Sequence, residues 1–274
     1  MPLDEKVQVL YLNPVGNSAD DQLFADMAAA YKYPGSTVHI ASLSGKQAPP
    51  RMNHLEYRSF EPLIAREILK AARYCGRRGI GALTIGCFYD PALDACREMS
   101  GDCVVVGPCQ ASLQAAAQLA NRFSVLIGRW KWEDQMRQAV CAYGYRDALA
   151  SFEAIDMGAE EFQKDPQRTR ERLQAAALDA VTRHRAEAII LGCTMEIGFY
   201  QSLQAFLERE AKARVPVIDA SIAALKAAEN AAILGRIGWR TSRVWGMAPP
   251  PEKELKAMEI YQEEIEFGNL LTVE

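Results

Sequence analysis

The sequence predicts an α/β protein built from two similar parallel-sheet domains. Three observations support this: apolar strand-like runs alternate with helix-like segments along most of the 274 residues, a strand-like run ends in a cysteine at two places, and similar elements follow both cysteines in the same order. Alternating strands and helices are typical of parallel sheets connected by crossover helices. The length suffices for two small domains whose cores need no disulfides.

The candidate strands are short apolar runs, most of them rich in valine, isoleucine or leucine. They are Val7 to Leu12, Val38 to Ala41, Ala82 to Gly86, Val104 to Gly107, Ser124 to Gly128, Ala188 to Gly192 and Val215 to Asp219. The candidate helices between them combine helical periodicity with helix-forming composition. They cover residues 21–32, 62–79, 91–99, 111–122, 132–144 and 166–185.

The segments around the two strand-end cysteines resemble each other. After Cys87 and after Cys193 comes a short valine-rich strand, then a turn and an alanine-rich helix. The spacing from Cys87 to Gly107 is 20 residues, whereas the spacing from Cys193 to Asp219 is 26. This pattern indicates either an approximate duplication or a chance similarity between two βαβ units. A duplication would place two similar cysteines in two similar domains that face one another.

Domain boundaries follow the repeat, because no Gly/Ser-rich linker separates the halves. We predict a first domain of residues 1–107 and 221–238 that carries Cys87, a second domain of residues 108–220 that carries Cys193, and a tail of residues 239–274. After a proline break, Leu255, Met258, Ile260 and Ile265 form an amphipathic helix pattern in the tail. This pattern predicts a packing arm or subunit contact, with a solvated terminal helix as the alternative.

Composition excludes several classes of protein. Lys and Arg total 31 against 35 Asp and Glu, a net charge of -4, and the positive residues are mostly dispersed, so we expect no nucleic-acid partner. Charges stand near the N-terminus where a signal peptide would need an apolar core, and no apolar run approaches the length of a membrane span. We therefore expect a cytoplasmic protein that does not associate with membranes.

Cysteine and histidine usage argues against disulfides and metals. Seven cysteines, an odd number, predict free thiols rather than a disulfide framework. The histidines His39, His54 and His184 show no zinc-binding spacing with one another or with a Cys-x-x-Cys pair. The chain also has no phosphate-cradling glycine motif, so we expect neither a metal nor a cofactor.

Cys87 and Cys193 are the candidate catalytic residues, because each directly follows the carboxyl end of a predicted strand. In α/β proteins, ligands bind at the end of the sheet where the strands finish. After Cys87, Asp90 suits an N-cap and Pro91 a first helical position, so a helix N-terminus should lower the thiol pKa. Cys193 has a similar setting, and the glycine before each cysteine allows close approach of backbone N–H groups to an anion. The alternative is that these thiols are simply buried, as cysteines commonly are.

The other five thiols are weaker candidates. Cys109 lies at another strand-to-helix turn and is intermediate, whereas the remaining four lie within helices or at a strand start: Cys75, Cys96, Cys103 and Cys141. Nothing in the sequence connects a histidine base to Cys87 or Cys193. Two thiols without histidine suit a reaction in which one thiolate removes a proton from carbon and the other thiol returns one from the opposite face.

Five segments occur in a characteristic order: CFYDPAL at 87–93, VVVGPCQASLQAA at 104–116, RFSV at 122–125, ILGCT at 190–194 and VPVIDASIAALKAAE at 215–229. Together they resemble the aspartate/glutamate/hydantoin racemase superfamily. The Cys-Phe-x-Asp-Pro element and the RFSV strand are most similar to its hydantoin and allantoin racemase branch. The resemblance covers about residues 7–236.

The resemblance implies two flavodoxin-like domains related by pseudo-twofold symmetry, with the active site in the interdomain cleft. It implies a cofactor-independent isomerase in which Cys87 and Cys193 form an acid/base pair. The implied small-molecule substrate is a 5-substituted hydantoin or an allantoin-like ring. The alternatives are an aspartate/glutamate-type amino-acid racemase and a non-catalytic ligand-binding member of the fold. We also expect a homo-oligomer.

The resemblance also implies substrate-binding residues. In the family an Asn-Pro-Asn-Thr/Ser turn after the first strand holds the substrate; Asn13 retains the first asparagine, and the second is replaced or displaced to Asn17. The other predicted substrate-binding residues are Phe88, Tyr89, Thr194 and Met195. Ile127-Gly128 stands where the branch usually has two threonines, and Met195 where it usually has glycine. These departures concern the substrate and leave the thiol pair intact.

Overall fold

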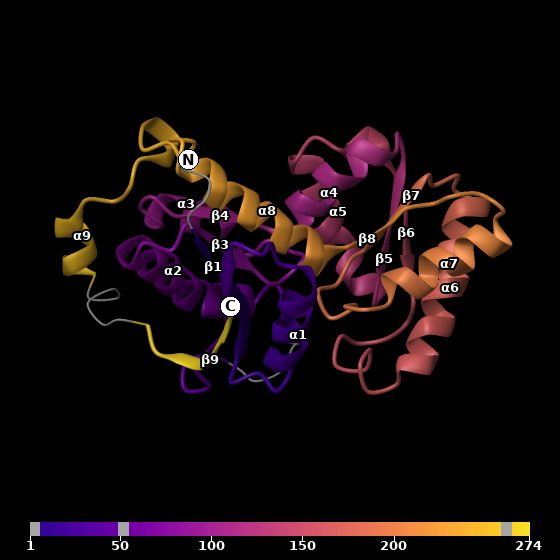
Figure 1. Cartoon of the computed structure of the whole chain (residues 1–274), viewed down its shortest axis with the longest axis horizontal. Helices are drawn as coiled ribbons and strands as arrows, with labels where there is room; N and C mark the ends of the chain where they lie inside the picture. The colour runs from indigo at the N-terminus through magenta and orange to yellow at the C-terminus, as the bar shows by residue number, and fades with distance from the viewer. Residues whose placement is uncertain (1–5, 49–54, 259–264) are drawn as a thin grey trace. The chain divides into compact units, whose positions relative to one another are not determined.

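The computed structural model describes residues 6–48, 55–258 and 265–274, and the chain forms two compact units (Figure 1). Unit 1 comprises Met1–Gly86, Pro91–Gly107 and Leu225–Glu274, and unit 2 comprises Cys87–Asp90 and Pro108–Ala224. Each unit contains a sheet of parallel strands, which confirms the predicted fold class. Within the described residues, no helix combines the length and the apolar character needed to cross a bilayer.

Unit 1 has a five-stranded sheet in the order β4-β3-β1-β2-β9. The four parallel strands are β1 (Val7–Gly16), β2 (Ser36–Leu43), β3 (Ala82–Ile85) and β4 (Val104–Val106), and β9 (Phe267–Val273) pairs antiparallel with β2. The helices of this unit are α1 (Asp21–Tyr31), α2 (Glu61–Arg78), α3 (Leu93–Met99) and α9 (Glu252–Ala257), and a short helical turn, η4 (Trp245–Met247), precedes α9. Strands β1 and β3 are buried on both faces of the sheet, as expected for a parallel sheet covered by helices.

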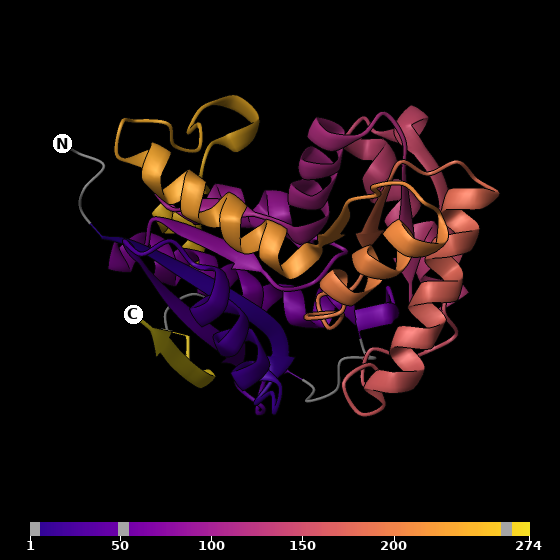
Figure 2. The same ribbon diagram turned by 45° about the vertical axis from the view of Figure 1, so that its right-hand side comes forward.

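Helix α8 (Ala220–Gly235) begins in unit 2 and continues in unit 1. Its alanines Ala228 and Ala232 pack against Val7 and Val9 of β1 and Ala82 of β3. Figure 2 shows this helix lying along the strands of unit 1. Small side chains allow the backbone of α8 to approach the sheet closely, which explains why the sequence of this helix is rich in alanine.

Unit 2 has a four-stranded parallel sheet in the order β6-β5-β7-β8. Its strands are β5 (Phe123–Ile127), β6 (Leu149–Ala154), β7 (Ala188–Leu191) and β8 (Val217–Asp219). Its helices are α4 (Pro108–Leu119), α5 (Glu133–Ala142), α6 (Pro166–Thr182) and α7 (Tyr200–Glu210), with short turns η2 (Trp130–Trp132) and η3 (Arg146–Ala148) flanking α5. All four strands end at the same edge of the sheet, where side chains of different loops can meet.

The two sheets share one strand order. In unit 1 the first strand, β1, lies between β2 and β3, and β4 lies outside β3; in unit 2 the first strand, β5, lies between β6 and β7, and β8 lies outside β7. Cys87 follows β3 and Cys193 follows β7, so each cysteine follows the third strand of its sheet. This common topology favours the duplication over a chance similarity.

The structure differs from the predicted organisation at three places, one of which is that residues 221–224 group with unit 2 and not with the first domain. Residues Cys87–Asp90 group with unit 2, although the strand before them belongs to unit 1. The tail groups with unit 1 and ends in β9, not in a helical arm. Only six residues of the predicted tail region form a helix, α9. Of its predicted apolar residues, Leu255 is buried and Met258 is exposed, whereas Ile260 lies outside the described residues.

Candidate active site

Cys87 lies immediately after β3, and the glycine before it is required by packing. The N–H of Gly86 donates a hydrogen bond of 2.7 Å to the carbonyl of Leu12 in β1. A Cβ at position 86 would lie 2.6 Å from the ring of Tyr11 and 3.1 Å from that carbonyl oxygen. The glycine therefore allows the backbone at position 86 to pack closely against β1, and its N–H is used there instead of facing an anion.

Asp90 anchors the Cys87 turn to unit 2. Its buried carboxylate accepts hydrogen bonds from the backbone N–H groups of Cys109 and Gln110, both at 3.0 Å, and from the hydroxyl of Tyr143 at 2.8 Å. Asp90 therefore caps the N-terminus of α4, whose positive end stabilises a carboxylate. The prediction that Asp90 caps the next helix along the chain is wrong, because Asp90 is in the left-handed region (φ 51°) and α3 begins only at Leu93.

Cys193 lies in a separate turn after β7. The N–H of Gly192 donates to the carbonyl of Leu126 in β5 at 2.8 Å, and a Cβ at position 192 would lie 2.4 Å from that oxygen. Cys193 and Glu196 are joined by two hydrogen bonds: Glu196 N–H donates to the Cys193 carbonyl at 3.0 Å, and Cys193 N–H donates to Glu196 Oε2 at 3.1 Å. This reciprocal pair has the geometry of a capping box, yet α7 begins only at Tyr200.

The Cys193 thiol is half-buried, and its pKa is raised well above the usual value. Burial is the main cause, the charge of Glu196 adds to it, and the backbone N–H of Met195 opposes it. The prediction of a lowered pKa at Cys193 is therefore wrong. The next helix along the chain, α7, begins only at Tyr200, whereas the acidic side chain of Glu196 lies within the turn.

The thiols of Cys87 and Cys193 lie close enough to interact electrostatically. Cys87 raises the pKa of Cys193, and also that of Cys109, which burial and the charge of Asp90 raise further. Cys87 is 8% exposed and Cys109 is fully buried. The structure thus brings the two predicted catalytic cysteines together within unit 2, with Cys109 as a third neighbour.

The remaining thiols lie elsewhere. Cys75, Cys96 and Cys103 form a buried group in unit 1, where burial raises the pKa of Cys75 well above its usual value and that of Cys96 to about 12. Cys141 is half-buried on α5. None of these four contributes to the pKa of Cys193.

The predicted substrate-binding residues fall into two groups. Phe88, Thr194 and Met195 are buried beside the two cysteines, Tyr89 is half-buried, and all four belong to unit 2. Asn13 belongs to unit 1, where its Nδ2 donates to Asp21 at 3.0 Å and its buried Oδ1 has no hydrogen-bond partner in the described part of the chain.

Asn17, the displaced second asparagine, has a local structural role. Its φ is 43°, in the left-handed region, and its Oδ1 accepts a hydrogen bond from the N–H of Gly45. Asparagine tolerates this backbone conformation better than most residues. Its side-chain oxygen is therefore already used in linking two turns of unit 1.

Position 128 explains one departure from the hydantoin branch. A Cβ at Gly128 would lie 2.4 Å from the ring of Trp132 and 2.5 Å from the carbonyl oxygen of Met157. Threonine cannot be placed there without moving the buried indole. Trp132 therefore occupies the space next to the end of β5 that a threonine would need.

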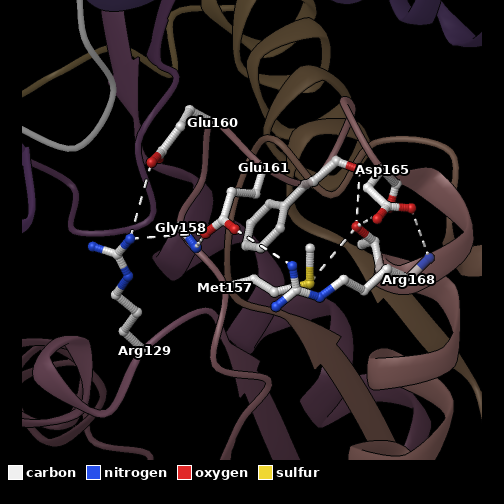
Figure 3. Close-up of polar contacts among 9 residues, drawn as sticks. Arg129, Met157, Gly158, Glu160, Glu161, Asp165 and Arg168 are labelled. Carbon is white, nitrogen blue, oxygen red and sulfur yellow. Dashed lines mark hydrogen bonds and ion pairs between the residues drawn. The ribbon is translucent and has the colours of Figure 1, made fainter.

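The loop of residues 155–165, after β6, supports the Cys193 turn. In this loop Glu161 accepts a hydrogen bond of 2.6 Å from Gly158 N–H and pairs with Arg129 and Arg168, each at 3.8 Å (Figure 3). The side chain of Gln163 then donates through Nε2 to the carbonyls of Met195 (2.9 Å) and Ile197 (3.2 Å). The ordered loop thus fixes two carbonyls of the cysteine turn.

Gln163→Glu should loosen the Cys193 turn, because a carboxylate of the same shape cannot donate to these two carbonyls. We expect the opening free energy of the turn to fall by about 2 kcal/mol, which corresponds to roughly 30-fold faster local exchange. Hydrogen–deuterium exchange of residues 193–199 measures this. The matched control is Gln167→Glu, at an exposed glutamine that donates to Glu171 on α6. Equal protection in the two variants would contradict the assigned role.

Three side chains of unit 2 could share a metal ion, a grouping that the sequence spacing does not reveal. One ligand atom from each of Glu153, Asp179 and His184 lies within 4.8 Å of the other two. Asp179 also forms an ion pair with Arg183 at 3.1 Å, which competes with a cation for its charge. His54, another histidine considered above, lies outside the described residues.

Sequence reasoning missed three polar residues around Cys193. Gln163 carries no local signal, because its partners lie more than thirty positions away. Glu196 could have been found from its spacing of three residues after Cys193, which is that of a capping box. Asp219 could have been found as the residue between a strand and an alanine-rich helix, the position of an N-cap.

The sequence matches a known protein family. Residues 9–228 match the family described as Asp/Glu/Hydantoin racemase. The chain is 33% identical over 221 residues to a hydantoin racemase of Pseudomonas sp. (strain NS671), covering 80% of this chain and 83% of the relative. It is 30% identical over 253 residues to a hydantoin racemase of Paenarthrobacter aurescens, covering 90% and 99%.

A solved structure extends the likeness to the whole fold. The allantoin racemase from Klebsiella pneumoniae has a TM-score of 0.77 and 27% sequence identity, and the match covers 90% of this chain and 94% of that one. The family match and both curated relatives span the two cysteine turns and the strands before them. The chain therefore belongs to the Asp/Glu/hydantoin racemase family and is an enzyme of the isomerase class.

Proposed function

We propose that this enzyme racemises a 5-substituted hydantoin or an allantoin-like ring, using Cys87 and Cys193 as its two acid/base groups. The observation that carries the proposal is the electrostatic interaction of two thiols that each follow the third strand of a sheet. The names of the relatives, hydantoin racemase and allantoin racemase, support the substrate class. The Asp/Glu-type substrates are the alternative within the family.

The chemistry needs one thiolate and one thiol. The thiolate removes the proton from the chiral carbon, the electron pair moves onto the adjacent carbonyl oxygen, and the other thiol delivers its proton to the opposite face. The two thiols have then exchanged their protonation states, and the substrate has inverted without a change in mass. Mutual repulsion keeps two neighbouring thiols from ionising together, which favours the one-proton state. Cys193, whose pKa is raised, suits the proton donor.

A panel of optically pure compounds tests the proposal. We expect hydantoins or allantoin to lose optical rotation at constant mass, while aspartate and glutamate do not. Racemisation should be followed by polarimetry and chiral chromatography and corrected for the spontaneous rate without enzyme. Loss of rotation only with an acidic amino acid would assign the enzyme to the alternative substrate class. No turnover of any compound, together with tight binding of one, would indicate a ligand-binding protein.

A further inference from the structure

The carboxyl groups of Glu196 and Asp219 are buried in or next to the Cys193 turn, and the proposed two-thiol chemistry gives neither of them a role. Glu196 is completely buried and Asp219 is 5% exposed. Glu196 belongs to the turn itself, and Asp219 ends the neighbouring strand β8. Buried carboxyl groups are expensive unless they are paired or protonated, so their presence here needs an explanation.

One oxygen of each carboxyl accepts hydrogen bonds from backbone N–H groups, for Glu196 in the Cys193 turn and for Asp219 at the start of α8. Glu196 Oε2 accepts the Cys193 N–H, and Asp219 Oδ1 accepts the N–H groups of Ser221 (2.9 Å) and Ile222 (3.2 Å). The hydroxyl of Ser221 in turn donates to the carbonyl of Thr194 at 2.9 Å. Glu196 is therefore held by the Cys193 turn, and Asp219 by the start of α8, which contacts that turn through Ser221.

The other oxygen of each carboxyl is buried and unused. Glu196 Oε1 and Asp219 Oδ2 have no hydrogen-bond partner within the described residues. Each is a strong acceptor whose desolvation would be costly if the group were charged. A proton carried by one of the two groups removes one charge and provides one donor.

The surroundings of the two carboxyl groups raise the pKa of both, which favours a protonated form. Burial raises the pKa of Glu196 well above its usual value, and the charge of Asp219 raises it further. Burial also raises the pKa of Asp219, to about 6, against the opposing N–H groups of Ile222, Ser221 and Gly198. Two carboxyls that repel each other titrate as a unit, and both shifts favour the state in which this unit keeps one proton.

We propose that Glu196 and Asp219 are positioning residues that share a single proton and thereby control whether the Cys193 thiol is ionised. When the proton is on Glu196, the group next to Cys193 is neutral and the thiolate can form. When Glu196 is charged, the thiol keeps its own proton. The groups that act on Cys193 are Glu196 and Cys87, and Asp219 acts through Glu196. The consequence for catalysis rests on the proposed function, whereas the control of the thiol does not.

Two isosteric variants should have different effects on the pKa of the Cys193 thiol. Glu196→Gln keeps an acceptor for the Cys193 N–H but can never be charged, so the pKa of Cys193 should fall by about one unit, a tenfold gain in thiolate below that pKa. Asp219→Asn keeps the acceptor for Ser221 and Ile222 but removes the charge that holds the proton on Glu196. Glu196 then ionises at lower pH, and the pKa of Cys193 should stay high or rise.

The measurement is the pH dependence of iodoacetamide alkylation at Cys193 in the full-length protein, followed by site-resolved mass spectrometry. It needs no racemisation assay, so its outcome is independent of whether the proposed function holds. An unchanged thiol pKa in Glu196→Gln, or shifts of the same sign in both variants, would overturn the proposal. The native protein offers a second measurement: the infrared band of a protonated, buried carboxyl should be present at neutral pH. Its absence would overturn the proposal even if a variant failed to fold.

In the enzyme, the same control should move the pH profile of turnover without a large change in KM. Glu196→Gln should shift the pH dependence of kcat to lower pH by the same amount as it shifts the thiol. A merely structural role would lower activity equally at every pH. If Glu196→Gln shows the expected fall in the pKa of Cys193 but the protein racemises no substrate, the proposed function is wrong. The inferred control of the thiol by the carboxyl pair is then still supported.

Discussion

Cys87→Ser and Cys193→Ser should each lower the rate of racemisation by a factor on the order of 10² to 10⁴. A hydroxyl is a far weaker base than a thiolate at neutral pH, so each variant loses the acid/base group on one face of the substrate. The Cys87 thiol affects the pKa of Cys193, and the two cysteines follow different strands, so we expect that neither can replace the other. Polarimetry on the substrate identified by the panel measures the loss.

Each serine variant should still exchange the substrate proton of one enantiomer. In deuterium oxide, the remaining thiol can remove and return a proton on its own face, with configuration retained. One variant should therefore exchange only the L form and the other only the D form, as observed by proton NMR of the chiral centre. Exchange of the same enantiomer by both variants would show that only one of the two thiols acts on the substrate.

Cys109→Ser provides the control for this pair. Cys109 is buried in the same unit and also interacts with Cys87, so it has a comparable environment without a place in the proposed chemistry. We expect this variant to racemise within a few-fold of the unaltered enzyme. If it were inactive while Cys193→Ser remained active, the second acid/base group would be Cys109.

Asp90→Asn should release the N-terminus of α4 and the Cys87 turn with it. The amide can accept one hydrogen bond, but its NH₂ group would face the N–H donors that now meet the carboxylate. Asp90 accepts hydrogen bonds from Cys109, Gln110 and Tyr143. Loss of charged hydrogen bonds in a buried position should cost about 3 kcal/mol of local stability. A displaced Cys87 should also reduce turnover by about 10².

Tyr143→Phe is the matched control, because it removes the bond from the hydroxyl to Asp90 Oδ2 and leaves the carboxylate and both backbone donors in place. Its cost should be about 1 kcal/mol. Hydrogen–deuterium exchange of the backbone amides of Cys109 and Gln110 distinguishes the two variants, since these amides should lose protection only in Asp90→Asn. Unchanged protection in Asp90→Asn would show that the cap contributes little.

The strands before the two cysteines were predictable because they are buried on both faces. Ala82–Ile85 and Ala188–Leu191 are fully buried, so they appear as short, largely apolar runs that each end at a glycine. Two other strands were not predictable on the same basis. Strand β6 is an edge strand with a mostly half-buried mixture of residues, and β9 is partly exposed and pairs with residues more than 200 positions away.

The candidate site shows the same limit in its polar contacts. The positions of Cys87 and Cys193 follow from local patterns, whereas the partners of Asp90 follow from tertiary contacts. Asp-Pro is a good local helix start, but the carboxylate of Asp90 is used 19 residues further on, at the start of another helix. The high pKa of Cys193 likewise results mainly from burial of the thiol, which cannot be predicted from the local sequence pattern of a helix start.

The antiparallel strand β9 has a consequence for the order in which the enzyme is completed during synthesis. All four strands of unit 2 have been translated once residue 219 is made. The sheet of unit 1 begins with residue 7 but waits for residue 273, because β9 covers the edge of β2. The unit whose strands are translated first is thus the last to close its sheet. Until then the backbone N–H and C=O groups along one edge of β2 have no strand partner, which is the kind of edge that nascent chains must keep from pairing with one another.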